Sequence, residues 1–198
     1  MSSLLQQFGQ IDIYLFDQLL RGRIVRGMRV FDAGCGGGRN LVYFLKEGFE
    51  VFGVDADRRA VEVVRRLAPA PMSENFRVET IEASSFPDSF ADVVLSSAVL
   101  HFARDDDHFN AMLRATWRVL KPGGLLFCRL ASSIGIEHLI RRIEGRRFAL
   151  PDGSDRYLVD EALLLQLTGE LGGKLADPLK TTVVQGQRSM TTWVVLKD

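Results

Sequence analysis

The chain of 198 residues has only two cysteines, Cys35 and Cys128. They lie far apart in the sequence and form no C-x-x-C pair, so we expect neither a structural disulfide nor a zinc site. No apolar run approaches the ~20 residues that a membrane span needs. The first ten residues lack the basic start and apolar core of a secretory signal. We therefore expect a cytoplasmic protein that has no membrane partner.

The chain also lacks an excess of charge of either sign. Its 25 basic and 25 acidic side chains give a formal net charge of zero. Proteins that bind nucleic acids usually carry a basic excess, so a nucleic-acid partner is not expected. The length and the hydrophobic share of 46% suit one globular domain over residues 1–198. The sequence leaves the oligomeric state open.

The most informative stretch is V-F-D-A-G-C-G-G-G-R-N, from Val30 to Asn40. It predicts a short buried strand over Arg29–Ala33, a glycine-rich turn, and a helix over Gly38–Glu47. Glycines let the backbone turn sharply and approach a ligand closely. The dinucleotide fingerprint G-x-G-x-x-G would need its third glycine where Arg39 stands. A nicotinamide-dependent oxidoreductase is therefore the alternative interpretation, with one of its three glycines missing.

Beyond this stretch, apolar strands alternate with amphipathic helices, which is typical of a parallel α/β sheet. Two further strands joined by a short turn at Gly186 predict an antiparallel hairpin at the end of the chain. The expected strands are Glu50–Val54, Phe76–Ile81, Asp92–Ser97, Leu125–Leu130, Ala176–Gln185 and Ser189–Leu196, and the expected helices are Asp57–Leu67, Asp105–Leu120 and Asp160–Leu171.

A first segment outside this alternation is a helical cap over residues 1–27. Apolar residues at helical spacing predict an amphipathic helix over Ile11–Arg21. Two interpretations of this helix remain open. It either covers an edge of the sheet, or it brings Tyr14 or Asp17 over a ligand pocket.

A second such segment is a polar insertion over residues 132–157. We expect a short helix over Ile136–Ile143 within it. The insertion carries the densest basic cluster of the chain: Arg141, Arg142, Arg146 and Arg147. These arginines either form a solvated surface or belong to a lid that attracts an anionic substrate.

The D-x-G-x-G-x-G pattern of Asp32 to Gly38 resembles motif I of the class I S-adenosylmethionine-dependent methyltransferases. From about residue 28 onward, the predicted sheet with its terminal hairpin resembles the layout of the same family. The resemblance implies a Rossmann-like, doubly wound α/β fold. Its seven-stranded sheet would have the order 3-2-1-4-5-7-6, with strand 7 antiparallel, plus an N-terminal helix. It also implies S-adenosyl-L-methionine as cofactor and S-adenosyl-L-homocysteine as product. The Gly-Arg-Asn ending of the turn resembles small tellurite-resistance and small-molecule methyltransferases.

Several acids suit such a cofactor. Asp55 ends the second strand, where a carboxylate can accept from ribose hydroxyls. The alternative role, capping the next helix, suits Asp57 better. Glu82 and Ala83 resemble the family's acid–alanine segment, which holds the adenine. The resemblance thus implies cofactor contacts from Tyr14, Asp32, Gly34, Cys35, Gly36, Gly38, Asn40, Asp55, Ala56, Glu82, Ala83 and Ser97.

The segment Ser96–Phe102 resembles the family's motif IV region, where the methyl acceptor binds. Ser97 and His101 are the candidates on that side, and His101 is either a catalytic contact or a packed structural residue. The acids Asp105–Asp107 are better explained as helix caps than as metal ligands, so no metal site is expected. No Asn/Asp-Pro-Pro-Tyr motif of amino-methylating nucleic-acid enzymes is present.

These observations predict methyl transfer to a small molecule. The reaction would be an in-line displacement, catalysed mainly by positioning. A cofactor-binding module that has lost turnover is the non-enzymatic alternative.

Overall fold

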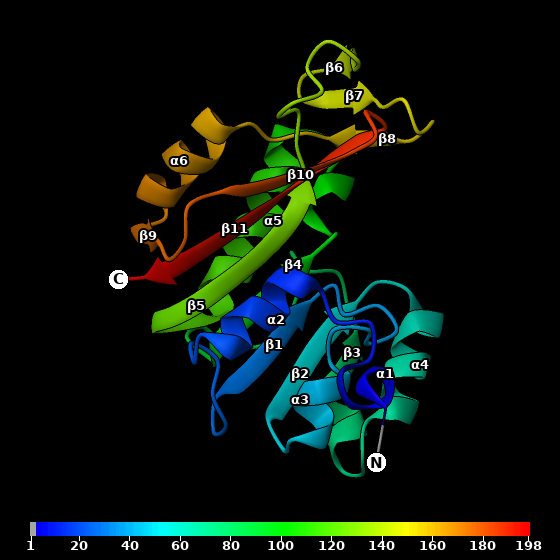
Figure 1. Ribbon diagram of the computed structural model, residues 1–198. Helices are drawn as coiled ribbons and strands as arrows, with labels where there is room; N and C mark the ends of the chain where they lie inside the picture. The colour runs from blue at the N-terminus through cyan, green and yellow to red at the C-terminus, as the bar shows by residue number, and fades with distance from the viewer. Residues whose placement is uncertain (1–2) are drawn as a thin grey trace.

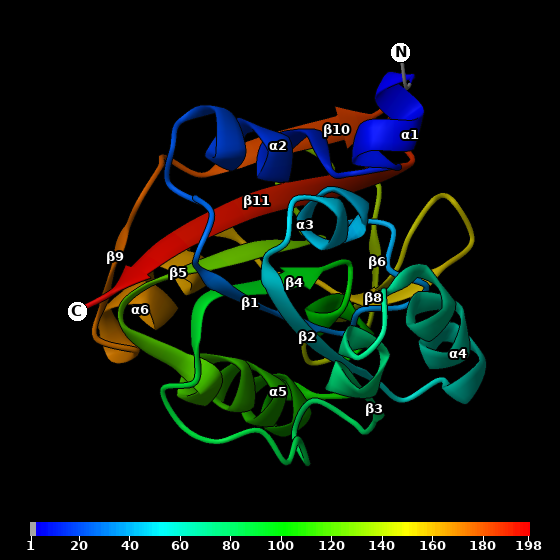
Figure 2. The same cartoon turned by 90° about the horizontal axis from the view of Figure 1, so that it is seen from below.

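One mixed sheet crosses the molecule, with helices on both of its faces (Figures 1 and 2). The computed structural model describes residues 3–198, so the first two residues of the predicted cap lie outside the described residues. The strands of this sheet are β1 (Arg29–Ala33), β2 (Glu50–Asp55), β3 (Phe76–Val78), β4 (Ala91–Ser97), β5 (Leu120–Ala131), β9 (Gly173–Leu175), β10 (Lys180–Val184) and β11 (Arg188–Lys197).

The strand order is β3-β2-β1-β4-β5-β11-β10, and β9 also pairs with β11. Strands β1 to β5 are parallel to one another, whereas β11 runs antiparallel to β5 and to β10. The predicted order 3-2-1-4-5-7-6 with an antiparallel seventh strand is therefore confirmed. The short strand β9 is an addition that the sequence did not indicate.

The two faces of the sheet bury separate apolar clusters. Helices α2 (Ile13–Leu20), α3 (Val42–Lys46) and α4 (Arg58–Leu67) cover one face, while α5 (Asp106–Val119) and α6 (Glu161–Glu170) cover the other. Successive residues of a strand point to opposite faces. Val30 accordingly packs in the cluster beneath α2, α3 and α4, and its neighbour Phe31 packs in the cluster beneath α5 and α6. This burial on both faces is why the central strands read as uninterrupted apolar runs.

Aspartates begin four of these helices, and the first of them, Asp12, accepts from the N–H of Tyr14 at 2.9 Å at the start of α2. Asp57, Asp105 and Asp160 accept hydrogen bonds from the backbone N–H groups of Arg59, His108 and Leu163 at 2.9, 2.7 and 2.8 Å. Such caps stabilise a helix by ~1 kcal/mol. Within residues 3–198, no three His, Cys, Asp or Glu side chains gather where they could hold a metal ion. No helix in the described part of the chain is long and apolar enough to cross a membrane.

The insertion differs from its prediction. The structure has no helix over Ile136–Ile143, so the prediction of one there is wrong. The chain instead forms a separate antiparallel sheet of β6 (Arg141–Glu144), β7 (Arg147–Ala149) and β8 (Asp155–Tyr157). All four residues of β6 are exposed, so Arg141–Glu144 has no apolar face that a helix could bury. Three elements are also clearly shorter than predicted: β3 ends at Val78, the helix after β1 begins at Val42, and β10 begins only at Lys180.

The N-terminal segment packs against the hairpin edge of the sheet. A short helix, α1 (Leu4–Phe8), begins with a capping box formed by Ser3 and Gln6. Helix α2 then lies over β10 and β11 (Figure 2).

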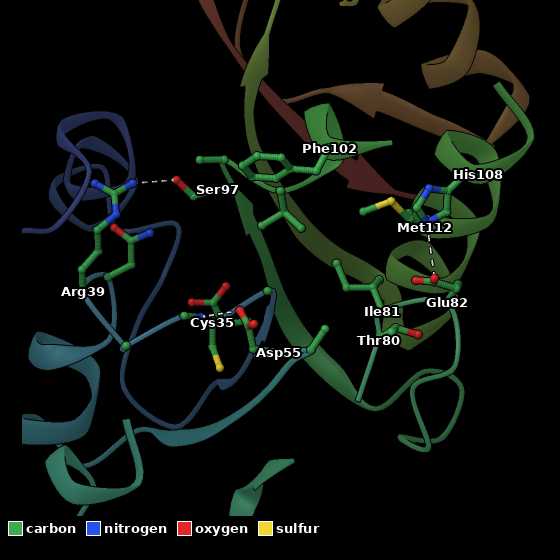
Figure 3. Close-up of a pocket in the computed structure, with 18 residues that line it drawn as sticks. Cys35, Arg39, Asp55, Thr80, Ile81, Glu82, Ser97, Phe102, His108 and Met112 are labelled. Carbon is green, nitrogen blue, oxygen red and sulfur yellow. Dashed lines mark hydrogen bonds and ion pairs between the residues drawn. The ribbon is translucent and has the colours of Figure 1, made fainter. Parts of the chain in front are cut away.

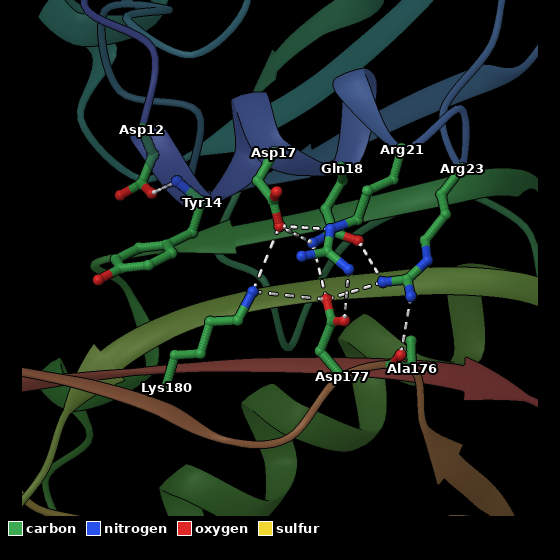
Figure 4. A network of polar contacts seen from close by, with 9 residues as sticks. All are labelled: Asp12, Tyr14, Asp17, Gln18, Arg21, Arg23, Ala176, Asp177 and Lys180. Carbon is green, nitrogen blue, oxygen red and sulfur yellow. Dashed lines mark hydrogen bonds and ion pairs between the residues drawn. The ribbon is translucent and has the colours of Figure 1, made fainter.

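A polar network fastens α2 in this place (Figure 4). Asp177 accepts from Gln18 at 2.9 Å and from Arg23 at 2.7 Å. Burial would raise the pKa of Asp177, but these hydrogen bonds outweigh it and hold the pKa below its usual range. Asp17 pairs with Arg21 at 2.8 Å and with Lys180 at 3.3 Å. The helix therefore covers a sheet edge, the first of the two interpretations.

Candidate functional site

A cavity of about 470 Å³ lies at the carboxyl ends of β1, β2 and β4 (Figure 3). This volume falls within the range of small-molecule sites, ~300–1,000 Å³. The carboxyl edge of an open parallel sheet is also where α/β proteins bind their ligands. Nine of the predicted site residues line it: Asp32, Gly34, Cys35, Gly36, Asn40, Asp55, Ala56, Glu82 and Ser97.

The glycine-rich turn after β1 forms the floor of this cavity. Gly34 has a φ of +97°, and a Cβ built there would lie 2.5 Å from Cγ2 of Val99. Gly36 has a φ of +51° and faces open space. Its N–H donates to Oδ2 of Asp55 at 2.8 Å. The turn is thus closely packed on one side, open on the other, and tied to the carboxylate that ends β2.

Asp32 lies buried beside this turn, with 2% of its surface exposed. Burial and, to a smaller extent, the negative charge of Asp55 raise its pKa to about 7, although the charge of Arg39 opposes the rise. No hydrogen bond to the Asp32 carboxylate comes from a side chain within residues 3–198. A cationic group in the cavity would favour the ionised form, because an opposite charge lowers the pKa of a carboxyl.

Asp55 has both carboxylate oxygens engaged by backbone groups. Besides the bond from Gly36, Oδ1 accepts from the N–H of Asp57 at 2.9 Å. Each oxygen keeps a second lone pair, so the carboxylate can still accept from ligand hydroxyls in the cavity. Asp57, and not Asp55, caps α4.

Glu82 and His108 form a pair on the opposite side of the cavity from Arg39, as Figure 3 shows. His108 Nε2 lies 3.3 Å from Glu82 Oε1, and its Nδ1 accepts from the N–H of Arg104 at 3.2 Å. Since Nδ1 accepts, Nε2 carries the proton and donates to the carboxylate. Ile81 and Met112 line the cavity beside this pair.

A third side of the cavity is formed where β4 ends. Arg39 donates to Oγ of Ser97 at 3.2 Å. The next residue, Ala98, has a φ of +65°, and its N–H donates to the carbonyl of Arg129 at 2.7 Å. A residue other than glycine in this conformation costs of order 1–3 kcal/mol and marks functional sites in many proteins. Phe102 follows, also lining the cavity, with 58% of its surface exposed.

His101 is not among the residues that line the cavity, which favours the second of its two interpretations, a packed structural residue. Only 6% of its surface is exposed, and its Nδ1 accepts from the N–H of Ala131 at 3.2 Å. Burial lowers its pKa to about 4, and the charge of Arg156 adds to this effect. His101 is a neutral, packed residue at ordinary pH. The histidine that the cavity does contain is His108, which the sequence showed only as part of a helix start.

Three predicted cofactor contacts also lie elsewhere. The hydroxyl of Tyr14 is 2.8 Å from Oγ1 of Thr182 on β10, and Tyr14 does not line the cavity. At Gly38, a Cβ would meet Cγ2 of Val64 at 2.6 Å, so this glycine permits packing of the turn on α4. Ala83 is exposed beyond Glu82. The cavity instead includes Gly37, Arg39, Thr80, Ile81, Ala98, Val99, Phe102, His108 and Met112, which were not among the predicted site residues.

A glycine turn and acids at successive strand ends define an α/β protein that binds a nucleoside-containing ligand. Comparison with known proteins specifies the family. A family model described as a methyltransferase domain matches residues 31–128. The chain therefore carries a methyltransferase domain over about half of its length.

Among curated relatives, a ubiquinone biosynthesis O-methyltransferase of Brucella anthropi is 31% identical over 168 residues. That alignment covers 79% of this chain and 64% of the relative, so the chain spans less than two thirds of the relative's length.

Two solved structures share the fold. A S-adenosylmethionine-dependent methyltransferase of Methanosarcina mazei has a TM-score of 0.75 at 19% identity, over 90% of this chain and 96% of the other. The 1,6-didemethyltoxoflavin-N1-methyltransferase of Burkholderia thailandensis has a TM-score of 0.71 at 18% identity, over 99% of this chain and 82% of the other. That enzyme was solved with 1,6-didemethyltoxoflavin and S-adenosylhomocysteine bound.

Proposed function

We propose that this chain binds S-adenosylmethionine in the cavity and transfers its methyl group to a small molecule. The observation that carries the proposal is that Asp32, Asp55 and Glu82 line one cavity around the glycine-rich turn. The three carboxylates come from the ends of β1 and β2 and from the segment after β3. They offer three separate acceptors for the three polar parts of the cofactor.

The residues present fit this cofactor. The buried carboxylate of Asp32, with its raised pKa, suits the ammonium group of the methionine part. The open space at Gly36 lets the backbone of the turn approach that part closely. The free lone pairs of Asp55 suit the ribose hydroxyls, and Glu82 can accept from the adenine amine. Ile81 and Met112 supply apolar contacts beside the ring.

When bound, the cofactor supplies an electrophilic methyl group on a sulfonium. The chain's own task is then to hold the two reactants in line and to keep water out of the cavity. Such positioning can lower a barrier by ~7–11 kcal/mol. The side of the cavity formed by Ser97, Ala98 and Phe102 is where we place the acceptor.

We also propose that two segments cover the site. Within residues 1–198, which we propose to act as one domain, the cap over 1–27 and the insertion over 132–157 would close over the cleft. In the cap, the N–H of Asp12 donates at 2.9 Å to Oδ1 of Asn40, which lines the cavity. The insertion reaches Phe102 through Arg156. Hydrogen exchange with and without S-adenosylhomocysteine tests this. Equal exchange of both segments in the two states contradicts closure.

The function itself is tested by calorimetry. The purified chain should bind S-adenosylmethionine and S-adenosylhomocysteine but not a nicotinamide dinucleotide, because Arg39 replaces the third glycine of the dinucleotide fingerprint. A panel of small-molecule acceptors with methyl-labelled cofactor then tests transfer. Cofactor binding without label transfer to any acceptor would favour a silent binding module. Tight binding of a dinucleotide alone would overturn the proposal. We place this reaction in the cytoplasm, with neither a nucleic acid nor a membrane as partner.

A further inference from the structure

Two arginines at the Ser97 side of the cavity have no acidic partner. Arg39 lines the cavity, and its side chain donates to the Ser97 hydroxyl. Arg156, from β8 of the small sheet, places its guanidinium carbon 4.9 Å from the centre of the Phe102 ring. Its side chain donates to the backbone carbonyl of Asp155. Neither arginine takes part in an ion pair within residues 3–198, whereas Arg129 and Arg146 do.

The insertion thus brings one cation to the cavity, and it is not one of the four that the sequence singled out. Arg146 pairs with Asp160 at 2.9 Å, and it lines a separate hollow together with Arg142. Arg141 is exposed on β6. Only Arg156 reaches a residue that lines the cavity, because its ring contact is with Phe102.

The same side of the cavity offers no group that could remove a proton. Ser97, Ala98, Val99 and Phe102 line it. His101 faces Ala131 instead. Of the ionisable groups that line the rest of the cavity, Glu82 and His108 pair with each other on the opposite side, and Asp32 and Asp55 serve the cofactor under the proposed function. Burial raises the pKa of the Cys35 thiol, so this group stays protonated. An acceptor bound here must therefore arrive with its nucleophilic atom already deprotonated.

Phe102 adds a preference for shape. It is a large apolar side chain lining a cavity, yet 58% of its surface is exposed. Aromatic rings pack well on one another in stacked or edge-on arrangements. A guanidinium above such a ring offers a planar, bidentate site for an anionic oxygen pair. Ring and cations together complement a flat molecule that carries negative charge.

We propose that Arg39, Phe102 and Arg156 form the acceptor site, and that the acceptor is a planar aromatic anion. The inference rests on the proposed function and names the substrate class for it. A lone pair of the anionic acceptor forms the new bond to the methyl carbon. The bond from that carbon to sulfur breaks, and its electron pair stays on sulfur. The negative charge of the acceptor and the positive charge of the sulfonium cancel, so no proton passes to the protein.

The test uses a flat anion and its neutral counterpart as ligands. The full chain is saturated with S-adenosylhomocysteine and titrated by calorimetry with 2-naphthoate and with 2-naphthamide. The naphthoate should bind at least about tenfold more tightly, the effect expected of one charge-assisted contact. Arg156→Gln should reduce that preference to less than about threefold, and Arg156→Lys should keep part of it, because the charge remains. Arg141→Gln, an exposed arginine of the same small sheet, is the matched control and should leave the preference unchanged.

A second variant separates charge from shape. Phe102→Ala should weaken both ligands by a similar factor and keep their ratio, since the ring contributes contact area and not charge. If S-adenosylhomocysteine itself fails to bind, the proposed function falls, and this inference falls with it. If S-adenosylhomocysteine binds but the naphthoate has no advantage, or keeps its advantage in Arg156→Gln, the inference alone is overturned.

Discussion

His108 donates from Nε2 to the Glu82 carboxylate across 3.3 Å, and both side chains line the cavity. Glutamate reaches one methylene further than the aspartate more usual in this family, so its position needs support. His108 is itself held, because its Nδ1 accepts from the backbone of Arg104. We infer that His108 positions the oxygen that accepts from the adenine amine.

This positioning role gives the first prediction. His108→Ala should weaken S-adenosylhomocysteine binding by ~0.5–1.5 kcal/mol, the typical net worth of one hydrogen bond. Calorimetry of His108→Ala, Glu82→Gln and the double variant measures the coupling between the two side chains. A coupling near zero would contradict the positioning role. S-inosylhomocysteine, which lacks the amine, should bind the native chain more weakly and respond less to either variant.

The second prediction concerns Asp55. Asp55→Ala should weaken S-adenosylhomocysteine binding by about 1–3 kcal/mol, because it removes a charged acceptor and frees the N–H of Gly36. Asp57→Ala is the control, since Asp57 caps α4 without lining the cavity. That variant should lower the free energy of unfolding by ~0.5–2 kcal/mol and leave binding unchanged. Equal effects of both variants on calorimetric affinity would remove Asp55 from the site.

The third prediction is a pH dependence of cofactor binding. The pKa of Asp32 is about 7 in the free protein, so the carboxyl is mostly neutral below that pH and attracts an ammonium poorly. Affinity for S-adenosylhomocysteine should therefore rise by up to ~10-fold per pH unit toward pH 7 and level off above it. Asp32→Asn should bind more weakly, with a flat profile. His108→Gln should keep the native slope, which excludes His108 as the source of the pH dependence. A native slope that persists in Asp32→Asn contradicts the assignment.

The fourth prediction concerns acid stability. The pKa of His101 is about 4 in the folded chain and near 6.5 when unfolded. Because the unfolded state takes up the proton first, stability should fall as the pH drops from about 6.5 through about 4. The loss should reach roughly 3 kcal/mol. His101→Asn retains an acceptor for the Ala131 N–H and should remove most of this dependence in urea unfolding at several pH values. If native chain and variant lose stability equally, another group is responsible.

The fifth prediction compares two glycines of one turn. Gly34→Ala places a Cβ 2.5 Å from Val99 Cγ2 at a φ of +97°, whereas Gly36→Ala meets nothing within 4 Å at a φ of +51°. Gly34→Ala should therefore destabilise the fold by several kcal/mol, through both overpacking and backbone strain. Gly36→Ala should cost about 1 kcal/mol in folding but weaken S-adenosylhomocysteine binding. Thermal unfolding and calorimetry separate the two effects, and equal unfolding temperatures would contradict the packing argument.

The central sheet was predictable because its strands are buried on both faces. Strands β1, β2, β4 and β5 therefore appear as apolar runs, and the acids at their ends follow at once. The small sheet was not predictable in this way. Arg141–Glu144 is exposed on both sides and carries three charges, so no periodicity reports a buried face. The one available signal was Gly145, a turn residue between two short segments that contain Ile143 and Phe148.

The site residues at strand ends could be predicted from the sequence, whereas those whose orientation depends on tertiary packing could not. Asp32 and Asp55 lie at the carboxyl ends of β1 and β2, while Gly34 and Gly36 follow β1 and Glu82 follows β3. The topology of the sheet alone therefore brings these residues together. His101 and His108 exchange their expected places. The short 3-10 helix η2 (Leu100–Phe102) turns the side chain of His101 toward β5, and the start of α5 brings His108 next to Glu82. No local pattern encodes that rotation.

The small sheet leaves and rejoins the rest of the fold at a single point. Ser132 and Val159 pair in an isolated parallel bridge, with the N–H of Ser133 donating to the carbonyl of Val159 at 2.9 Å. Residues 133–158 are therefore a loop whose two ends already touch. Tyr157 stacks on Phe109 of α5 and donates to Asp106. A homologous loop of another length that keeps this anchor can replace the rest without moving β5 or α6, since closing short or long loops differs by only ~0.6 kcal/mol per doubling of length. Acceptor preference can thus diverge, in evolution or by grafting, while the half of the molecule that holds the cofactor stays as it is.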